Sequence, residues 1–347
     1  MSASILAKKL GLSVSTVYRA LSKPEAVSSE VLQSIHSTAK ALNLDLQKRS
    51  PRGRPTKHSL RASGKLNLGV WFVGGDEQQA YRFIGAQIAL LRAACENVGF
   101  NYQFLFSSSV DDIPFVIQAG KIDAVLLEGL MPSSRALDFM VRMPAVWLMT
   151  RRSADYPGDF VEPDNESNGR IAADYLADRG HSKVAYVTTE PDYPAFARRE
   201  ASFTARCTER GLQIVRSTAL PQLKHLHLRP LPGEDVQMQL AKELLRARPK
   251  PTGVYLPNDI AAGPLSSGLR QLGANPEDLD WIIGDYSPHV PGSVWSALHP
   301  RPAGIDINLN SIIRVAVEIA ALRIRQKDIA GRIGVQISPS LVPPPER

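Results

Sequence analysis

The sequence predicts an α/β protein in which an N-terminal three-helix module precedes a two-lobed body of doubly wound parallel sheets. Two observations lead to this prediction. The first 45 residues contain three short helical patterns, punctuated by Gly11 and Pro24. From Leu66 onward, apolar runs alternate with amphipathic helical segments in two successive series. Repeated βα units favour parallel sheets with helices on both faces.

The positive charge of the chain is concentrated at its N-terminus. The 347 residues carry a formal net charge of +7, but residues 1–65 hold 12 Lys/Arg and 3 Asp/Glu, a net of +9, so the remainder sums to −2. A small basic module on a near-neutral body indicates a polyanionic partner for the module alone.

Targeting signals and cofactor motifs are absent from the sequence pattern. No apolar run is long enough to cross a bilayer, and the first residues lack the apolar core of a secretory signal. The two cysteines, Cys95 and Cys207, have no metal-ligand spacing. We therefore expect a cytoplasmic protein with no membrane partner, no metal and no cofactor.

The first helical patterns predict a helix-turn-helix. Gly11 suits the end of a first helix, and Ser13 is a good N-cap for a second helix over Val14 to Leu21. Pro24 prevents that helix from continuing far. Ser28 or Ser29 then caps a third helix with an apolar stripe.

The stretch "AKKLGLSVSTVYRALSKPEAVS" resembles the N-terminal headpiece of the LacI/GalR family of transcription regulators. The resemblance implies that residues 1–46 form a helix-turn-helix DNA-binding headpiece. The second helix of such a module lies in the major groove with its first side chains facing base edges.

Six residues of this helix and its cap are candidates for DNA contact. Val14, Ser15 and Arg19 are placed to face base edges, where Arg19 could bind a guanine edge or a phosphate. Ser13 and Thr16 suit phosphate contacts at a helix start. Tyr18 departs from the family, which usually has a small residue there; it either reaches a phosphate or packs on the third helix.

The body resembles the same family through "PDNESNGRIAADYLADRGHSKVAYV", "RREASF", "GVYLPNDIAAG" and "ISPSLVPP". This resemblance implies a periplasmic-binding-protein-like effector sensor over residues 66–347 that dimerises. We expect a first lobe of about residues 66–160 and 292–325, and a second lobe of about 161–291 and 326–347. Ligands of such sheets favour the carboxyl ends of the strands.

Two residues of the body are candidate effector contacts by this resemblance, Arg199 and Asp259. A guanidinium and a carboxylate can each pair neighbouring hydroxyls of a sugar-like ligand. Aromatic residues near the expected strand ends could form an aromatic surface under the ligand, although each could equally pack in a core. They are Trp71, Phe83, Phe196, Tyr286 and Trp295. The order Asp285-Tyr286 is the reverse of the family pattern, which puts the usual side-chain direction in doubt.

Residues 47–65 form a basic linker, "RSPRGRPTKHS" being its centre. The family ends this segment in a hinge whose leucine wedges into the minor groove, and Leu60 matches that leucine. The linker is longer than the family norm by about half a dozen residues. Its Arg52 and Arg54 could belong to a flexible spacer, contact phosphates, or enter a narrow A·T-rich minor groove like an AT-hook.

These observations predict a DNA-binding transcription regulator and not an enzyme, because no catalytic triad, metal cluster or phosphate loop stands out. We expect a homodimeric repressor that binds a palindromic site on double-stranded DNA. A small-molecule effector, a carbohydrate or related metabolite, would control its affinity. Two alternatives remain at this point: an architectural DNA-binding protein whose body only dimerises, and a ligand-binding receptor.

Overall fold

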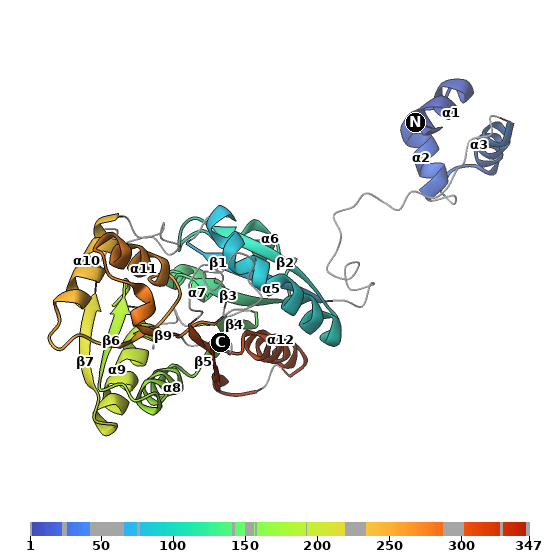
Figure 1. The fold of residues 1–347 in the computed structure, drawn as a ribbon. Helices are drawn as coiled ribbons and strands as arrows, with labels where there is room; N and C mark the ends of the chain where they lie inside the picture. Colours follow the sequence, from blue (N-terminus) through green and yellow to red (C-terminus); the bar gives the residue numbers. More distant parts are fainter. Residues whose placement is uncertain are drawn as a thin grey trace. The chain divides into compact units, whose positions relative to one another are not determined.

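A computed structural model of the chain describes residues 2–22, 26–41, 66–74, 77–140, 143–149, 156, 158–191, 193–218, 234–286, 302–326 and 329–344. It divides into two compact units, Met1–Ser63 and Gly64–Arg347 (Figure 1). We describe each unit by itself.

The first unit is the three-helix headpiece, formed by α1 (Ser2–Leu10), α2 (Val14–Ser22) and α3 (Ser29–Ala41). Gly11 lies between α1 and α2 in the left-handed region, with φ +63°, which a glycine adopts at no steric cost. Ser13 Oγ accepts a hydrogen bond from Thr16 N at 3.1 Å, which confirms it as the cap of α2.

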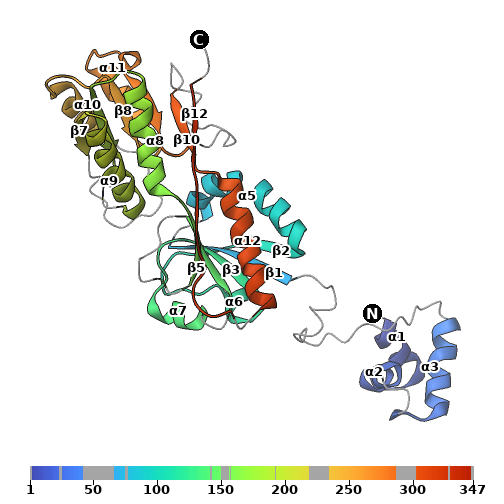
Figure 2. The ribbon, with the colours of Figure 1, turned by 90° about the horizontal axis from the view of Figure 1, so that it is seen from below.

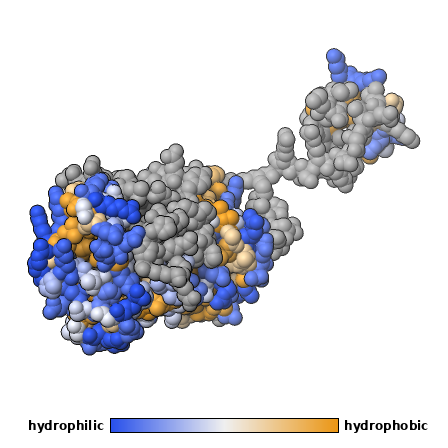
Figure 3. Space-filling view, viewed as in Figure 1, coloured by the Kyte–Doolittle hydropathy of each residue, from blue (hydrophilic) through white to orange (hydrophobic). Residues whose placement is uncertain are grey.

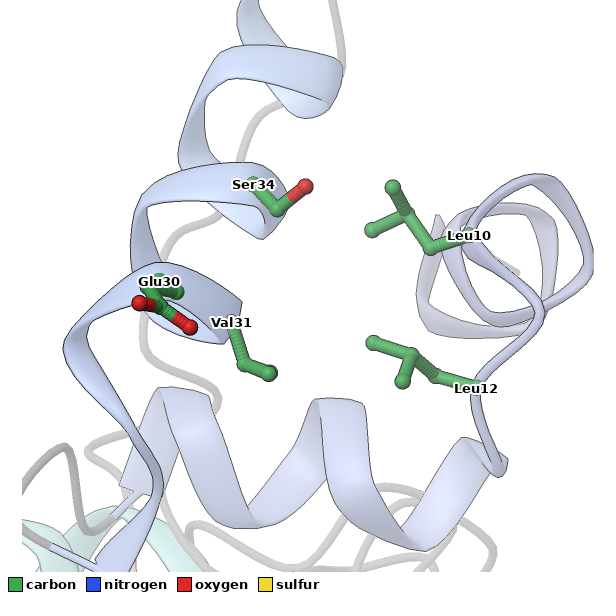
Figure 4. Close-up of a pocket in the computed structure, with 5 residues that line it drawn as sticks. All are labelled: Leu10, Leu12, Glu30, Val31 and Ser34. Atoms are coloured by element: carbon green, nitrogen blue, oxygen red, sulfur yellow. The ribbon is translucent and has the colours of Figure 1, made fainter.

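A compact apolar core holds the three helices together. Its buried members come from all three helices: Leu6, Ala7, Val17, Ala20, Ile35 and Ala39. The core is open on the side where α1 faces α3, because Leu10 and Leu12 lie opposite Val31 across a small hollow (Figure 4). Val14 and Arg19 of α2 do not line this hollow, so the outer side of α2 remains a separate surface.

The second unit contains two six-stranded sheets, one in each lobe (Figures 1 and 2). In the first sheet all neighbouring strands are parallel. The strand order is β11 (Gly334–Ile337), β5 (Asp159–Pro163), β4 (Ala145–Leu148), β3 (Ala124–Gly129), β1 (Leu66–Val73) and β2 (Phe100–Ser107).

Helices cover both faces of the first sheet. One face packs against α5 (Glu77–Val98) and α12 (Leu309–Arg325), through a core that includes Leu91 and Ile313. The other face packs against α6 (Phe115–Gln118) and α7 (Ser134–Met140), through a core that includes Ile117 and Ala136. Figure 2 shows these two helical layers on opposite sides of the strands.

The second sheet repeats the arrangement with one exception. Its order is β12 (Ser340–Val342), β10 (Ala303–Asp306), β9 (Asp280–Ile283), β8 (Gly253–Leu256), β6 (Lys183–Thr188) and β7 (Gln213–Thr218). Only the edge strand β12 pairs antiparallel. One face packs against α8 (Asn165–Asp178) and α9 (Pro194–Glu209). The other packs against α10 (Glu234–Arg246) and α11 (Ala262–Gln271), beside the short η3 turn (Pro276–Asp278). The predicted α/β class with two doubly wound lobes is confirmed.

The lobe boundaries differ from the expected ones. The sequence predicts residues 292–325 in the first lobe, but β10 pairs with β9 of the second sheet. It predicts residues 326–347 in the second lobe, but β11 pairs with β5 of the first sheet. The reason is that the chain crosses between the lobes three times, after Pro163, between Asp306 and Leu309, and between Ile337 and Ser340. The short strands at these crossings pair with the sheet that lies next to them, which the local sequence does not determine.

Candidate functional site

The second lobe buries a positive charge at the carboxyl ends of its strands. Arg199, on α9, is only 2% exposed. Its Nε donates to Asn165 Oδ1 at 2.8 Å, and its Nη1 donates to Asp285 Oδ1 at 2.7 Å and to the carbonyl of Pro257. These partners follow β5, β9 and β8, so the guanidinium ties together segments distant in the sequence.

Neighbouring side chains stabilise the positive charge of the buried Arg199. Burial alone disfavours the charged form, but Asp285, with smaller contributions from Tyr255 and Tyr193, offsets this effect, so the pKa of Arg199 lies above its ordinary value. The guanidinium carbon lies 5.6 Å from the centre of the Phe196 ring, within the range of a cation–π contact. Asp285 itself is 31% exposed, so the pair is open on the carboxylate side.

Close packing of α8 on α9 fixes the backbone under Arg199. A Cβ on Gly169 would lie 2.2 Å from the carbonyl oxygen of Arg199, so only glycine permits this approach. Next to it, Asn168 Nδ2 donates to the Gly284 carbonyl at 2.7 Å and its Oδ1 accepts from the Tyr255 hydroxyl at 2.7 Å. The loop before Asp285 is therefore anchored to α8.

Several polar atoms around Arg199 are left without a hydrogen-bond partner. They are Asn165 Nδ2 and Asn258 Oδ1, both on buried side chains. Most buried polar groups in proteins are paired, so an unsatisfied donor and an unsatisfied acceptor at strand ends indicate a place where a polar ligand would complete the network.

The first lobe also carries a buried polar pair at the carboxyl end of a strand. Glu128, the last residue but one of β3, is 7% exposed, and Gln87 of α5 is 3% exposed. Gln87 Nε2 donates to Glu128 Oε2 at 3.1 Å. Burial raises the pKa of Glu128 to about 7, although the bond from Gln87 opposes the increase.

A salt bridge joins the two lobes beside these clusters. Arg198 of α9 donates to both carboxylate oxygens of Glu162 on β5, at 2.9 and 3.2 Å. Glu162 is 1% exposed, and Gln336 of β11 lies 3.4 Å from its Oε1. The carboxyl edge of the first sheet therefore faces the start of α9, which also carries Arg199.

The structure brings some of the expected effector residues together. Phe196 contacts Arg199 directly. Asp259 follows Asn258 at the end of β8 and is half-buried, while Tyr286 follows Asp285, also half-buried, with its ring packed against Gly304. Asp285, Asn165 and Glu128 were not singled out as ligand contacts from the sequence.

The remaining expected aromatics do not join this cluster. Trp71 is 0% exposed within the first-lobe core, and its Nε1 donates to Ser107 Oγ at 3.0 Å. It therefore offers neither surface nor a free donor to a ligand, and core packing explains it. The side chain of Phe83 and the whole of Trp295 lie outside the described residues.

The headpiece places the start of α2 at the surface. Val14 is 40% exposed and Arg19 is exposed. Ser13 and Thr16 bond each other through their hydroxyls at 2.8 Å, so both lie at the helix start. The side chains of Ser15 and Tyr18, and the whole of Arg52, Arg54 and Leu60, lie outside the described residues.

The described residues lack the features of two other classes of protein. No group of three or more His, Cys, Asp or Glu in the described part of the chain could hold a metal ion. Among its helices, none combines the length and apolar character needed to span a membrane.

Comparison with known proteins agrees with this architecture. A family model of a periplasmic-binding-protein-like domain matches residues 173–343. The transcriptional repressor PurR of Mannheimia succiniciproducens is 24% identical over 345 residues, covering 97% of this chain and 96% of its own. The transcriptional regulator IpsA of Corynebacterium glutamicum is 24% identical over 308 residues, covering 82% of each chain.

Solved structures share the fold along almost the whole chain. The transcriptional regulator CelR in complex with cellobiose superposes with a TM-score of 0.61 at 17% identity, covering 98% of both chains. The Lac repressor bound to ONPG superposes with a TM-score of 0.60 at 16% identity, covering 98% of this chain and 97% of its own. The domain match, the full-length repressor relatives and the shared two-lobed fold support a transcription regulator of the LacI/GalR type.

Proposed function

We propose that this protein is a repressor that binds a palindromic site on double-stranded DNA as a homodimer, and that a small polyhydroxylated effector controls its affinity. The observation that carries the proposal is the Arg199 cluster, with unsatisfied polar atoms at the carboxyl ends of the strands. The same chain carries a basic helix-turn-helix, so a ligand site and a DNA-reading module are covalently linked.

The DNA side of the proposal uses α2 in the major groove. The exposed Val14 suits contact with a thymine methyl, and Arg19 suits a guanine edge or a phosphate. Ser13 and Thr16 at the helix start suit phosphates, where the backbone N–H groups and helix dipole add to the attraction. Ser15 and Tyr18 complete the candidate contacts along this helix.

The effector side of the proposal uses Arg199, Asp259, Phe196 and Tyr286, joined by Asp285, Asn165 and Asn258. Carboxylates accept and a guanidinium donates to neighbouring hydroxyls, which matches a sugar-like molecule. Structural neighbours of the chain support this class: the CelR structure holds cellobiose, and a LacI-family regulator from Enterococcus faecium holds ribose. Trp71 is left out because its indole is buried and bonded.

An exposed helical face supports the homodimer. Ile88 on α5 is 37% exposed, beside the small exposed residues Ala89 and Ala93. Figure 3 shows apolar surface over this helix. Apolar side chains gathered on one outward face favour association with another protein surface, and a two-fold dimer matches a palindromic DNA site.

Regulation follows from the three chain crossings between the lobes. A ligand that binds one arrangement of the lobes more tightly shifts the population toward it, and the DNA affinity changes by the same coupling free energy. The linker would carry this change to the headpiece, with Leu60 as a minor-groove wedge and Arg52 and Arg54 in contact with phosphates or the minor groove.

Fluorescence anisotropy with labelled genomic fragments from around the gene tests the function. We expect one palindromic fragment to bind at least about a hundredfold more tightly than a scrambled fragment of the same composition. Ala at Arg52 and Arg54 should lower the affinity and reduce the slope of log affinity against log salt by about 2. Equal affinity for all fragments at moderate salt would contradict the proposal.

A further inference from the structure

The ion pair of Arg199 and Asp285 presents its carboxylate, and not its guanidinium, to the solvent. Asp285 Oδ1 accepts a hydrogen bond from Arg199 Nη1 at 2.7 Å. The side chain of Arg199 is 2% exposed, whereas that of Asp285 is 31% exposed. A ligand that approaches this pair from the solvent therefore meets the carboxylate before it meets the guanidinium.

Other acceptors of the protein also surround the guanidinium of Arg199. Its Nε donates to Asn165 Oδ1 at 2.8 Å, and its Nη1 donates to the carbonyl of Pro257 as well as to Asp285. Since Asp285 already balances the positive charge, an anionic group of a ligand would gain little attraction from Arg199. It would also lie against the like charge of Asp285, and such repulsion is strong where a site is partly buried.

The hydrogen-bonding groups beside the pair suit a hydroxyl group better than an anion. Because Asn165 Oδ1 accepts from Arg199, its Nδ2 is fixed as a donor, and this atom is buried without a partner. The carboxylate of Asp285 only accepts. A hydroxyl group both donates and accepts, whereas an ionised carboxyl or phosphate group only accepts. An uncharged hydroxylated ligand therefore suits both side chains, and an anion suits Asn165 alone.

We propose that Asp285 makes the effector site selective for uncharged ligands, because it takes the position on Arg199 at which a carboxylate or phosphate group of a ligand would otherwise bind. This inference rests on the proposed effector function. It follows that loss of the carboxylate converts the site into an anion site. In Asp285→Ala, a space the size of a carboxyl group opens beside an unpaired guanidinium, which binds carboxylates through charge-assisted hydrogen bonds.

Thermal unfolding of the full-length protein tests this conversion, with sodium formate as the anion, sodium chloride at equal ionic strength as the reference and formamide as the uncharged analogue. We expect formate to raise the midpoint of Asp285→Ala by about 2 to 4 °C over chloride, as a ligand at several times its dissociation constant does. Wild type should show no such rise, because Asp285 already pairs with Arg199. Formamide should not replace formate.

Two further variants serve as controls. Arg199→Met combined with Asp285→Ala removes the guanidinium as well and should lose the response to formate. Glu318→Ala removes a carboxylate that pairs with Arg314 at 3.0 Å, but both of these side chains are 50% exposed, so it should gain no response. Binding of formate to the basic headpiece is common to all four proteins and cancels in the comparison.

Three results would overturn the inference: no response in Asp285→Ala, an equal response in wild type, or an equal response in Glu318→Ala. If Asp285→Ala unfolds without an added anion, it should refold in formate and not in formamide, and equal recovery in both would overturn the inference too. A change in the operator affinity of wild type by D-glucose 6-phosphate would sustain the proposed function while overturning this inference. Sequence-independent DNA binding contradicts the function alone.

Discussion

The two lobes are built alike but treat buried charge in opposite ways. Each is a six-stranded sheet with helices on both faces and polar side chains at the carboxyl ends of its strands. In the second lobe, the buried Arg199 has its counter-charge in Asp285. In the first lobe, the buried Glu128 pairs with the amide of Gln87, and no cation among the described residues accompanies it. The second lobe thus balances its buried charge with an opposite charge, whereas the first lobe favours the neutral form of its buried carboxyl group.

Removal of Arg199 should have the largest effect, because it breaks the complete pair. Arg199→Met leaves Asp285 without its counter-charge and Asn165 Oδ1 without its donor. We expect a loss of about 3 to 4 kcal/mol in the free energy of unfolding of the body, measured by urea denaturation. The double variant Arg199→Met with Asp285→Asn should lose less than the sum of the single variants, since both charges are gone.

A surface pair provides the control for this prediction. Arg314 pairs with Glu318 at 3.0 Å on α12, and both side chains are 50% exposed. Arg314→Met should change the stability by less than about 0.5 kcal/mol. A comparable loss from Arg199→Met and Arg314→Met would mean that the Arg199 cluster is not an integrated part of the fold.

Glu128 should produce the next largest effect, visible as a dependence of stability on pH. Its pKa is about 7 in the folded protein against an ordinary value of 4.5, so between these two pH values the folded state holds a proton that the unfolded state releases. The contribution of Glu128 to stability is therefore fully present below pH 4.5 and is lost as the pH rises from about 4.5 through about 7. The expected decrease is roughly 3 kcal/mol between pH 4.5 and 8.

The comparison of wild type with Glu128→Gln isolates this effect. The variant cannot ionise at position 128, so its stability relative to wild type should increase steadily from pH 5 to pH 8 in denaturation series. The control Glu96→Gln, which removes an exposed carboxylate from α5, should leave the wild-type profile unchanged. Parallel profiles for wild type and Glu128→Gln would show that Glu128 meets a cation, and the contrast between the lobes would be lost.

The smallest of the three effects should come from Arg198, which joins the lobes. Arg198 is 33% exposed and Glu162 is 1% exposed, so loss of the pair leaves Glu162 with weaker partners. Arg198→Gln should lower the stability by about 1 to 2 kcal/mol, after allowance for solvent screening at the exposed arginine. Differential scanning calorimetry should also show whether the lobes unfold less cooperatively; an unchanged thermogram would mean that the bridge couples them little.

The headpiece was predictable from sequence because its signals are local. Gly11 in the turn, Ser13 at the cap and Val17 in the core all lie within seven residues and are borne out. The alternation of strands and helices in the body was predictable for the same reason. The lobe boundaries were not, because β10, β11 and β12 are three or four residues long and only tertiary contacts decide which sheet each joins.

The candidate site was predictable only in part. The sequence singled out Arg199 and Phe196, which the structure places in contact. The Asp285 carboxylate that pairs with Arg199 is 86 residues away in sequence, and no local sequence pattern indicates a pairing over that separation. Glu128 could have been noticed from the sequence, because it is an acidic residue that directly follows the apolar residues "AVLL" of an expected strand. Trp71 was singled out from the sequence as an aromatic residue near a strand end, but its neighbours bury it completely.

The central claim is that a ligand held at the strand ends of the body controls DNA binding by the headpiece. Its most direct test is the affinity of the full-length protein for its palindromic fragment, measured by anisotropy with and without a panel of sugars, for wild type and Arg199→Met. We predict that one ligand changes the wild-type dissociation constant by at least about fivefold, and that Arg199→Met binds the DNA but ignores the ligand. An identical ligand response in Arg199→Met, or an affinity that no ligand of the panel changes, would contradict the account.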